Sequence, residues 1–170
     1  MRPLVYAAAA GGIAAGPARA ADLLVSVEIP RLNVSEYHRP YVAVWLEGAG
    51  QKVTNLAVWY DVGMKNGEGT KWLKDMRTWW RRSGREVAMP ADGLSGATRP
   101  PGKHQIAFKS AAGPVADLPA GEYSLVVEAA REVGGRELLR IPFQWPPKAV
   151  QVADTKGESE LASIAVELKP

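Results

Sequence analysis

The chain contains no cysteine. This absence excludes disulfide bridges, thiolate metal sites, iron–sulfur clusters and thioether attachment of haem. Histidine is also scarce, since His38 and His104 are the only two and lie far apart in the sequence. We find no Ser-His-Asp set, no paired-carboxylate motif, no P-loop and no dinucleotide fingerprint. The sequence therefore offers no catalytic constellation of its own.

The chain also lacks a large excess of positive or negative charge. The formal net charge is +3, and Arg2 and Arg19 lie in the first 20 residues. Without these two arginines, 19 Lys and Arg residues remain against 18 Asp and Glu residues, a formal +1. This near balance gives no case for nucleic acid or an anionic membrane surface as a partner.

The N-terminal residues have the pattern of an export signal. Met1-Arg2-Pro3 supplies a positive start, residues 4–16 are apolar and uncharged, and Ala18-Arg19-Ala20 is an Ala-x-Ala cleavage site. This pattern predicts a signal peptide at 1–20, cleaved after Ala20, because the apolar run is too short for a stable membrane span. We expect a periplasmic or secreted protein, soluble after cleavage, in which 21–170 form a single domain.

Alternation of apolar and polar residues indicates a mainly β protein. The predicted strands are 22–30, 41–47, 53–60, 103–109, 122–133, 137–145 and 162–169. Gly134-Gly135 predicts a hairpin between two of them. Asp154, Glu158 and Glu160 are predicted to lie in a solvated loop before the last strand. Seven strands separated by turn signals predict an immunoglobulin-like β-sandwich.

One amphipathic helix is predicted from Thr70 to Arg82. Its apolar stripe consists of Trp72, Leu73, Met76, Trp79 and Trp80. Thr70 is the predicted N-cap and Gly84 the predicted stop. Core packing is the simplest role for these tryptophans, and contact of one with a cofactor ring is the alternative. The helix lies in a connection, 61–101, whose length indicates a function.

The same connection contains the heptapeptide Asp92-Gly93-Leu94-Ser95-Gly96-Ala97-Thr98. It resembles the Asp-Gly-x-Ser/Thr-Gly-Ala-Thr signature at which FAD:protein FMN transferases attach FMN to flavin-carrying subunits of bacterial ion-pumping redox complexes. The resemblance implies that Thr98 carries FMN through a phosphoester. A hydroxyl is a weak nucleophile, and its activating base would come from the transferase.

The neighbouring residues suit this chemistry. Gly96 and Ala97 leave little bulk near the acceptor hydroxyl. Asp92 and Ser95 can hold a turn through side-chain bonds to backbone N–H groups, and Arg99 can pair with a phosphate. The predicted FMN site comprises Asp92, Gly93, Ser95, Gly96, Ala97, Thr98 and Arg99. The competing interpretation is an ordinary surface loop, since Asp, Gly, Ser and Pro are common in loops.

Two further resemblances concern longer stretches. Residues 98–130, with Pro100-Pro101-Gly102 and Pro119-Ala120-Gly121-Glu122-Tyr123, resemble the immunoglobulin-like repeat of flagellar-hook-capping type. Residues 22–145 resemble a family of predicted periplasmic proteins of unknown function, through the segments 41–47, 72–81 and 95–102. Members of that family are associated with the FMN transferase and with PepSY-type membrane reductases, so the resemblance implies both as partners.

Two functions remain open. The first is an exported redox carrier, rather than a stand-alone enzyme, that holds FMN on Thr98 and passes electrons between a membrane reductase and an extracytoplasmic acceptor. The second is a flavin-free periplasmic binding or assembly module. This module would dock a protein partner through 61–101, or deliver haem or a metal through His38. Arg81, Arg82 and Arg85 are either a solvated basic cluster, a phosphate contact or a docking patch.

Overall fold

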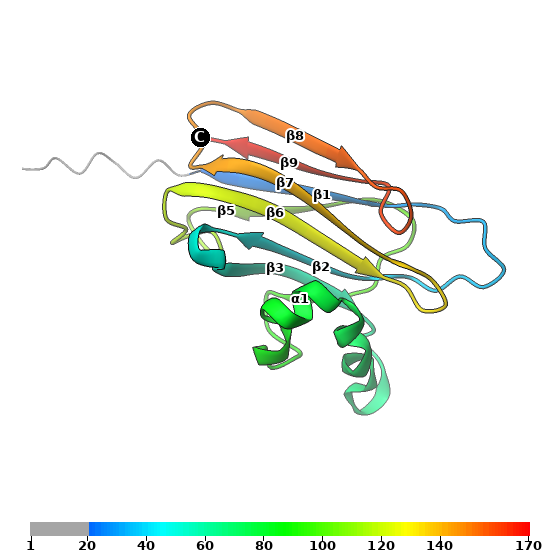
Figure 1. The fold of residues 1–170 in the computed structure, drawn as a ribbon. Helices are drawn as coiled ribbons and strands as arrows, with labels where there is room; N and C mark the ends of the chain where they lie inside the picture. Colours follow the sequence, from blue (N-terminus) through cyan, green and yellow to red (C-terminus); the bar gives the residue numbers. More distant parts are fainter. Residues whose placement is uncertain (1–20) are drawn as a thin grey trace, which may run out of the picture.

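A computed structural model describes residues 21–170, which form two packed β-sheets (Figure 1). The predicted signal peptide lies outside the described residues. One sheet has the order β5-β1-β9-β8, with β1 (Asp22–Ile29), β5 (Gly102–Lys109), β8 (Gln151–Lys156) and β9 (Ser163–Lys169). The other has the order β4-β3-β2-β6-β7, with β2 (Tyr41–Glu47), β3 (Val53–Tyr60), β4 (Ser95–Ala97), β6 (Gly121–Ala130) and β7 (Arg136–Trp145). The predicted β-sandwich is confirmed.

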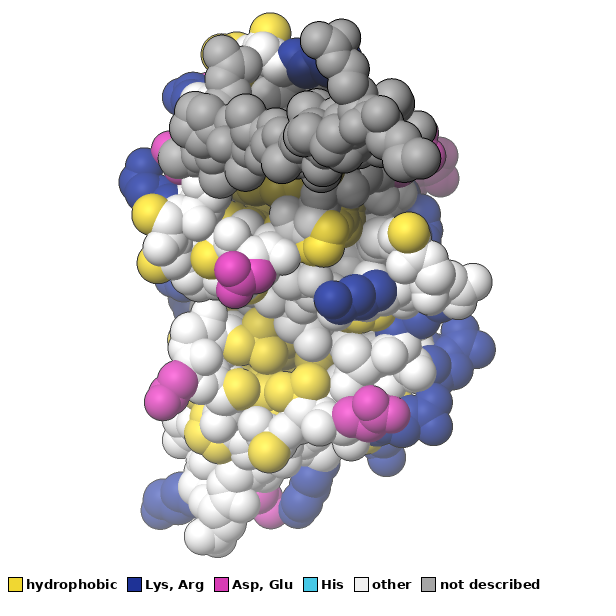
Figure 2. Space-filling model, turned by 90° about the vertical axis from the view of Figure 1, so that its left-hand side faces the viewer, with side chains coloured by type: hydrophobic (Ala, Val, Ile, Leu, Met, Phe, Trp, Pro, Cys, Tyr) yellow, Lys and Arg dark blue, Asp and Glu magenta, His cyan; other side chains and the backbone are white. Residues whose placement is uncertain are grey.

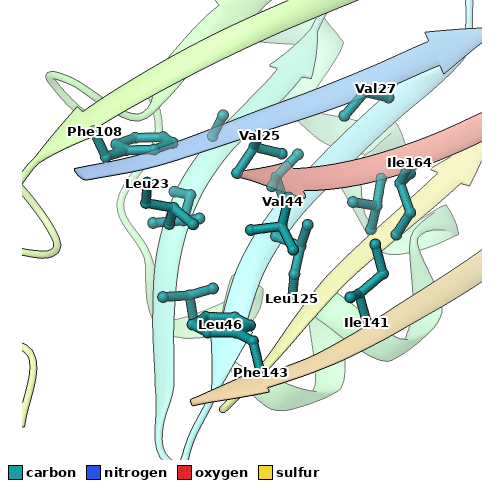
Figure 3. Close-up of a cluster of buried hydrophobic side chains, with 14 of the residues drawn as sticks. Leu23, Val25, Val27, Val44, Leu46, Phe108, Leu125, Ile141, Phe143 and Ile164 are labelled. Carbon is teal, nitrogen blue, oxygen red and sulfur yellow. The ribbon is translucent and has the colours of Figure 1, made fainter. Parts of the chain in front are cut away.

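The main core lies between the two sheets. Leu23, Val25 and Val27 of β1 are at most 1% exposed, as period-two alternation requires for a strand with one face inward. They meet Val44 and Leu125 from the other sheet (Figure 3). Removal of these side chains from water is the main force that holds the two sheets together.

A second apolar cluster covers the outer face of the β2–β3–β6 sheet. Trp45 and Val58 of the sheet pack with Leu73, Met76 and Trp79 of the connection 61–101. The connection lies below this sheet in Figure 1. Strand β2 is therefore buried on both faces, which explains why its sequence is a continuous apolar run without polar residues at alternate positions.

The predicted helix over 70–82 is wrong as a single element. The chain forms a 3-10 segment, η2 (Lys65–Asp75), and then a short helix, α1 (Arg77–Arg82), separated by Met76 with ψ at 74°. A further 3-10 turn, η3 (Gly84–Glu86), follows. The predicted Thr70 cap is also wrong, because the Thr70 hydroxyl donates to the Gly67 carbonyl.

A residue distant in sequence determines where α1 begins. Glu128 of β6 is fully buried and accepts hydrogen bonds from the backbone N–H groups of Thr78 and Trp79. Its carboxylate thus satisfies the unpaired donors at the first turn of α1. Trp72 precedes this point and is 42% exposed, so it does not belong to the buried stripe as the sequence predicted.

Strands β4 and β8 were not expected. The strand β8 extends to Lys156, where a solvated loop was predicted, and Asp154 lies within it. Glu160 is not solvated either, since it is 4% exposed and paired with Arg131. The hairpin at Gly134-Gly135 is present between β6 and β7.

The surface is mixed in charge. The end of the sandwich shown in Figure 2 carries small apolar patches between scattered acidic and basic side chains, with Lys and Arg more frequent along one side. Neither sign of charge covers this face, in keeping with the near-neutral composition. No helix in the described range, 21–170, has the length and apolar character needed to cross a membrane.

Candidate functional site

The parallel pairing of β3 and β4 positions the heptapeptide. Tyr60 at the end of β3 is the register partner of Ala97 at the end of β4. The next residue on each strand, Asp61 and Thr98, therefore emerges at the same edge of the sheet. The Thr98 hydroxyl donates to Oδ1 of Asp61 over 3.4 Å. Asp61 was not among the residues predicted for the site, although its position directly after the predicted strand 53–60 could have indicated it.

The turn before β4 has a defined geometry. Gly93 has φ at +72°, a left-handed conformation that glycine adopts at little cost. Ser95 Oγ accepts a hydrogen bond from the Ala91 N–H over 2.9 Å, and the Ser95 N–H donates to the Ala91 carbonyl over 2.9 Å. Asp92 is exposed at the tip of the turn. The turn thus directs the chain into β4 and towards Thr98.

Gly96 lies against a core tryptophan. A Cβ at Gly96 would lie 3.2 Å from Cδ1 of Trp59, closer than most van der Waals contacts. Ala97, the next residue, is exposed. The glycine therefore has a packing role within the sheet, whereas Ala97 leaves the approach to Thr98 open to solvent.

Thr98 and Arg99 lie in different environments. The Thr98 side chain lines a cavity. The Arg99 guanidinium carbon lies 5.3 Å from the centre of the Trp59 ring, which also packs edge-on against His104. The structure thus brings Thr98 to the cavity and leaves Arg99 outside its lining.

The cavity beside Thr98 has a volume of about 820 Å³. This volume is within the range of roughly 300–1,000 Å³ that is usual for small-molecule sites. Its walls come from the loop before β2, the β6–β7 hairpin and the connection 61–101. Its lining includes Tyr37, His38, Arg39, Tyr41, Asp61, Met64, Trp72, Asp75, Arg77, Thr98, Arg131, Glu132, Val133 and Arg136.

Two of the four cavity arginines are fixed by buried carboxylates. Arg131 donates to both oxygens of Glu160, over 2.8 and 3.2 Å, and both side chains are nearly inaccessible to solvent. Arg136 pairs with Glu128 over 2.7 Å. The other two, Arg39 and Arg77, have no carboxylate within 4.0 Å among residues 21–170 and can bind an anion.

Two tyrosines whose hydroxyl groups have a raised pKa are part of the cavity lining. Burial raises the pKa of Tyr41 to about 12, and its hydroxyl donates to the Gly69 carbonyl over 3.1 Å. Burial also raises the pKa of Tyr37. The Tyr37 hydroxyl is inaccessible to solvent and has no hydrogen-bond partner within the described range. A ligand in the cavity would therefore not reach the Tyr37 hydroxyl, although Tyr37 contributes to the lining.

The two histidines have different surroundings. His38 lines the cavity, and a hydrogen bond from its ring to Glu36 raises its pKa. His104 lies on β5 and contacts the Pro100 carbonyl over 2.8 Å. Over residues 21–170, no three His, Cys, Asp or Glu side chains are arranged to hold a metal ion.

Comparison with known proteins agrees with the export signal. Residues 22–163 match the family described as "Predicted periplasmic protein (DUF2271)". No curated protein and no solved structure matches the chain. The predicted periplasmic location is confirmed, as is the resemblance to a periplasmic family of unknown function. Because the match spans most of its length, the chain belongs to the DUF2271 family of periplasmic proteins.

Proposed function

We propose that the protein is a periplasmic electron carrier that holds FMN covalently on Thr98. One observation carries the proposal: the threonine that ends the Asp92–Thr98 motif lines a cavity of about 820 Å³. Thr98 is also only partly buried, so another enzyme can reach its hydroxyl. A surface loop with ordinary turn chemistry would not need a cavity beside its last residue.

The attachment step balances without any redox change. Thr98 Oγ1 forms a bond to the phosphorus of the FMN half of FAD, the pyrophosphate bond breaks and AMP leaves. The hydroxyl proton passes to a base of the FAD:protein FMN transferase. Asp61 accepts the hydrogen bond of Thr98 and so orients its hydroxyl. Gly96 and Ala97 keep the approach free of bulk.

The residues of the cavity fit such a group. Trp72 and Tyr37 offer aromatic surface, and Arg39 and Arg77 offer guanidinium groups without a carboxylate partner in the described range. Aromatic lining with a few convergent polar groups is typical of cofactor sites. When bound, the flavin would supply reversible electron transfer, while the chain holds it and shields it from water.

The direction of electron flow comes from the family resemblance. A PepSY-type membrane reductase is the proposed donor, and the acceptor lies outside the cytoplasm. Two of the exposed arginines of α1, Arg77 and Arg81, lie on the same connection as Thr98 and offer positive charge to an acidic partner surface. The protein acts as a carrier and needs no substrate of its own.

Substitution of the acceptor residue tests this proposal. The protein is exported together with an active FMN transferase, and covalent flavin is measured by absorbance of the denatured protein and by intact mass. The wild type and Thr70→Ala should carry flavin, because Thr70 lies on the same connection but outside the motif. Thr98→Ala should be colourless. Covalent flavin retained on Thr98→Ala would contradict the proposal.

A flavin-free binding module is the second candidate. The cavity favours this second candidate, because a small ligand can bind there without any bond to Thr98. The same experiment separates the two functions. A colourless wild type, made with a transferase that modifies a control substrate, would leave non-covalent binding as the function of the cavity.

A further inference from the structure

Arg99 lies beside one tryptophan, Trp59, and Thr98 shares a cavity with another, Trp72, and the two tryptophans differ in exposure. Trp59, on the side of Arg99, is 3% exposed and is covered by the Arg99 guanidinium and His104. Trp72, on the cavity side, is 42% exposed. A ring tethered to Thr98 therefore has an exposed indole within the same cavity on which to stack.

The other tryptophans of the connection do not line the cavity. Trp79 is fully buried, and its indole N–H donates to Asn55 over 2.9 Å. Trp80 packs beside Trp79 with the ring centres 6.2 Å apart and does not line the cavity. Trp72 is thus the tryptophan of the connection that combines exposure with a place in the cavity lining.

We propose that the isoalloxazine ring of FMN on Thr98 lies inside the cavity against Trp72. The inference rests on the proposed function and adds the location of the ring. Thr98 and Trp72 line the same cavity, so the ring can reach the indole without leaving the cavity.

Flavin fluorescence tests the location of the ring. An indole stacked on a flavin quenches its emission by electron transfer. The flavin-carrying wild type should therefore be dim and become several-fold brighter after proteolysis. Trp72→Phe should be several-fold brighter than the wild type before proteolysis, at equal covalent flavin by mass. The matched control, Trp80→Phe, should stay as dim as the wild type.

Two results would overturn the inference and leave FMN attachment intact. They are a wild type as bright as its proteolytic flavopeptide, and a Trp72→Phe variant as dim as the wild type. Absence of the FMN adduct from every variant would overturn the proposed function itself.

Discussion

Thr98 and Asp61 contact each other because they follow the paired ends of two parallel strands. The Thr98 hydroxyl donates to the Asp61 carboxylate over 3.4 Å, and the preceding residues, Ala97 and Tyr60, are register partners. The carboxylate also accepts from the Tyr41 hydroxyl over 3.4 Å. The proposed acceptor hydroxyl is therefore held by the sheet itself and by a residue distant in sequence.

Loss of the Asp61 carboxylate should slow FMN attachment. Asp61→Ala leaves the Thr98 hydroxyl free to rotate, and misplacement of a reacting group typically costs about 10- to 100-fold in rate. The rate is measured from the growth of the FMN adduct by mass, with purified transferase and FAD. Asp75→Ala, which removes another exposed carboxylate of the cavity, is the control. Equal rates for the two variants would exclude a positioning role for Asp61.

Bulk at Gly96 should disturb β4. A Cβ added at Gly96 would lie 3.2 Å from Cδ1 of Trp59. The larger branched side chain of Gly96→Val must therefore displace either the Trp59 ring or the backbone of β4. Overpacking of this kind typically costs about 1–3 kcal/mol in the free energy of unfolding, measured here by urea denaturation. Ala97→Val, at an exposed position, should change stability little. The packing argument fails if the two substitutions have the same effect.

Glu128 should be important for stability although it lies far from Thr98 in sequence. Glu128→Ala removes the acceptor of the Thr78 and Trp79 N–H groups and leaves Arg136 without its carboxylate. We expect a loss of about 3 kcal/mol in the free energy of unfolding, because buried donors are left unpaired. Glu122→Ala, an exposed residue of the same strand, is the control, and a similar loss there would contradict this role.

Glu137 should make stability depend on pH in acid. Partial burial alone would raise the pKa of Glu137, but hydrogen bonds from the N–H groups of Glu158, Leu161 and Ser159 outweigh it and lower the pKa below the ordinary 4.5. The unfolded chain then binds the proton more tightly, so Glu137 stabilises the fold above pH 4.5 and loses this effect as pH falls through the lowered pKa.

The substitution Glu137→Gln tests this dependence. The urea midpoint of the variant should lie below that of the wild type at pH 7, and the two midpoints should converge as pH falls below 4.5. Glu158→Gln removes a neighbouring exposed carboxylate and should change neither the midpoint at pH 7 nor its pH dependence. A gap between Glu137→Gln and wild type that stays constant with pH would contradict the account.

Local pattern was sufficient for much of the fold. Strands such as β2 and β3 could be predicted to the residue, because each is an apolar run and turn signals mark where the run ends. The helix could not, because Glu128 on a distant strand determines where α1 begins. The strand β4 has only three residues, and its parallel partner is distant in sequence, so no local periodicity marks it.

The candidate site was predictable only as a motif. Asp92–Thr98 could be recognised in the sequence, but its neighbours could not. Asp61, Tyr37 and Trp72 come from separate segments and meet Thr98 only in the folded cavity. Arg99 was predicted as a phosphate contact because it is adjacent to Thr98, whereas in the fold its guanidinium lies beside Trp59.

Intact mass of the mature protein tests the central claim most directly. The protein is exported in a host that contains an FMN transferase shown to be active on a control substrate. We predict a gain equal to one FMN less water, located on Thr98 by fragmentation of the peptide that contains Asp92–Thr98. An unmodified mass, or an adduct on another residue, would contradict the assignment of Thr98 as the flavin carrier.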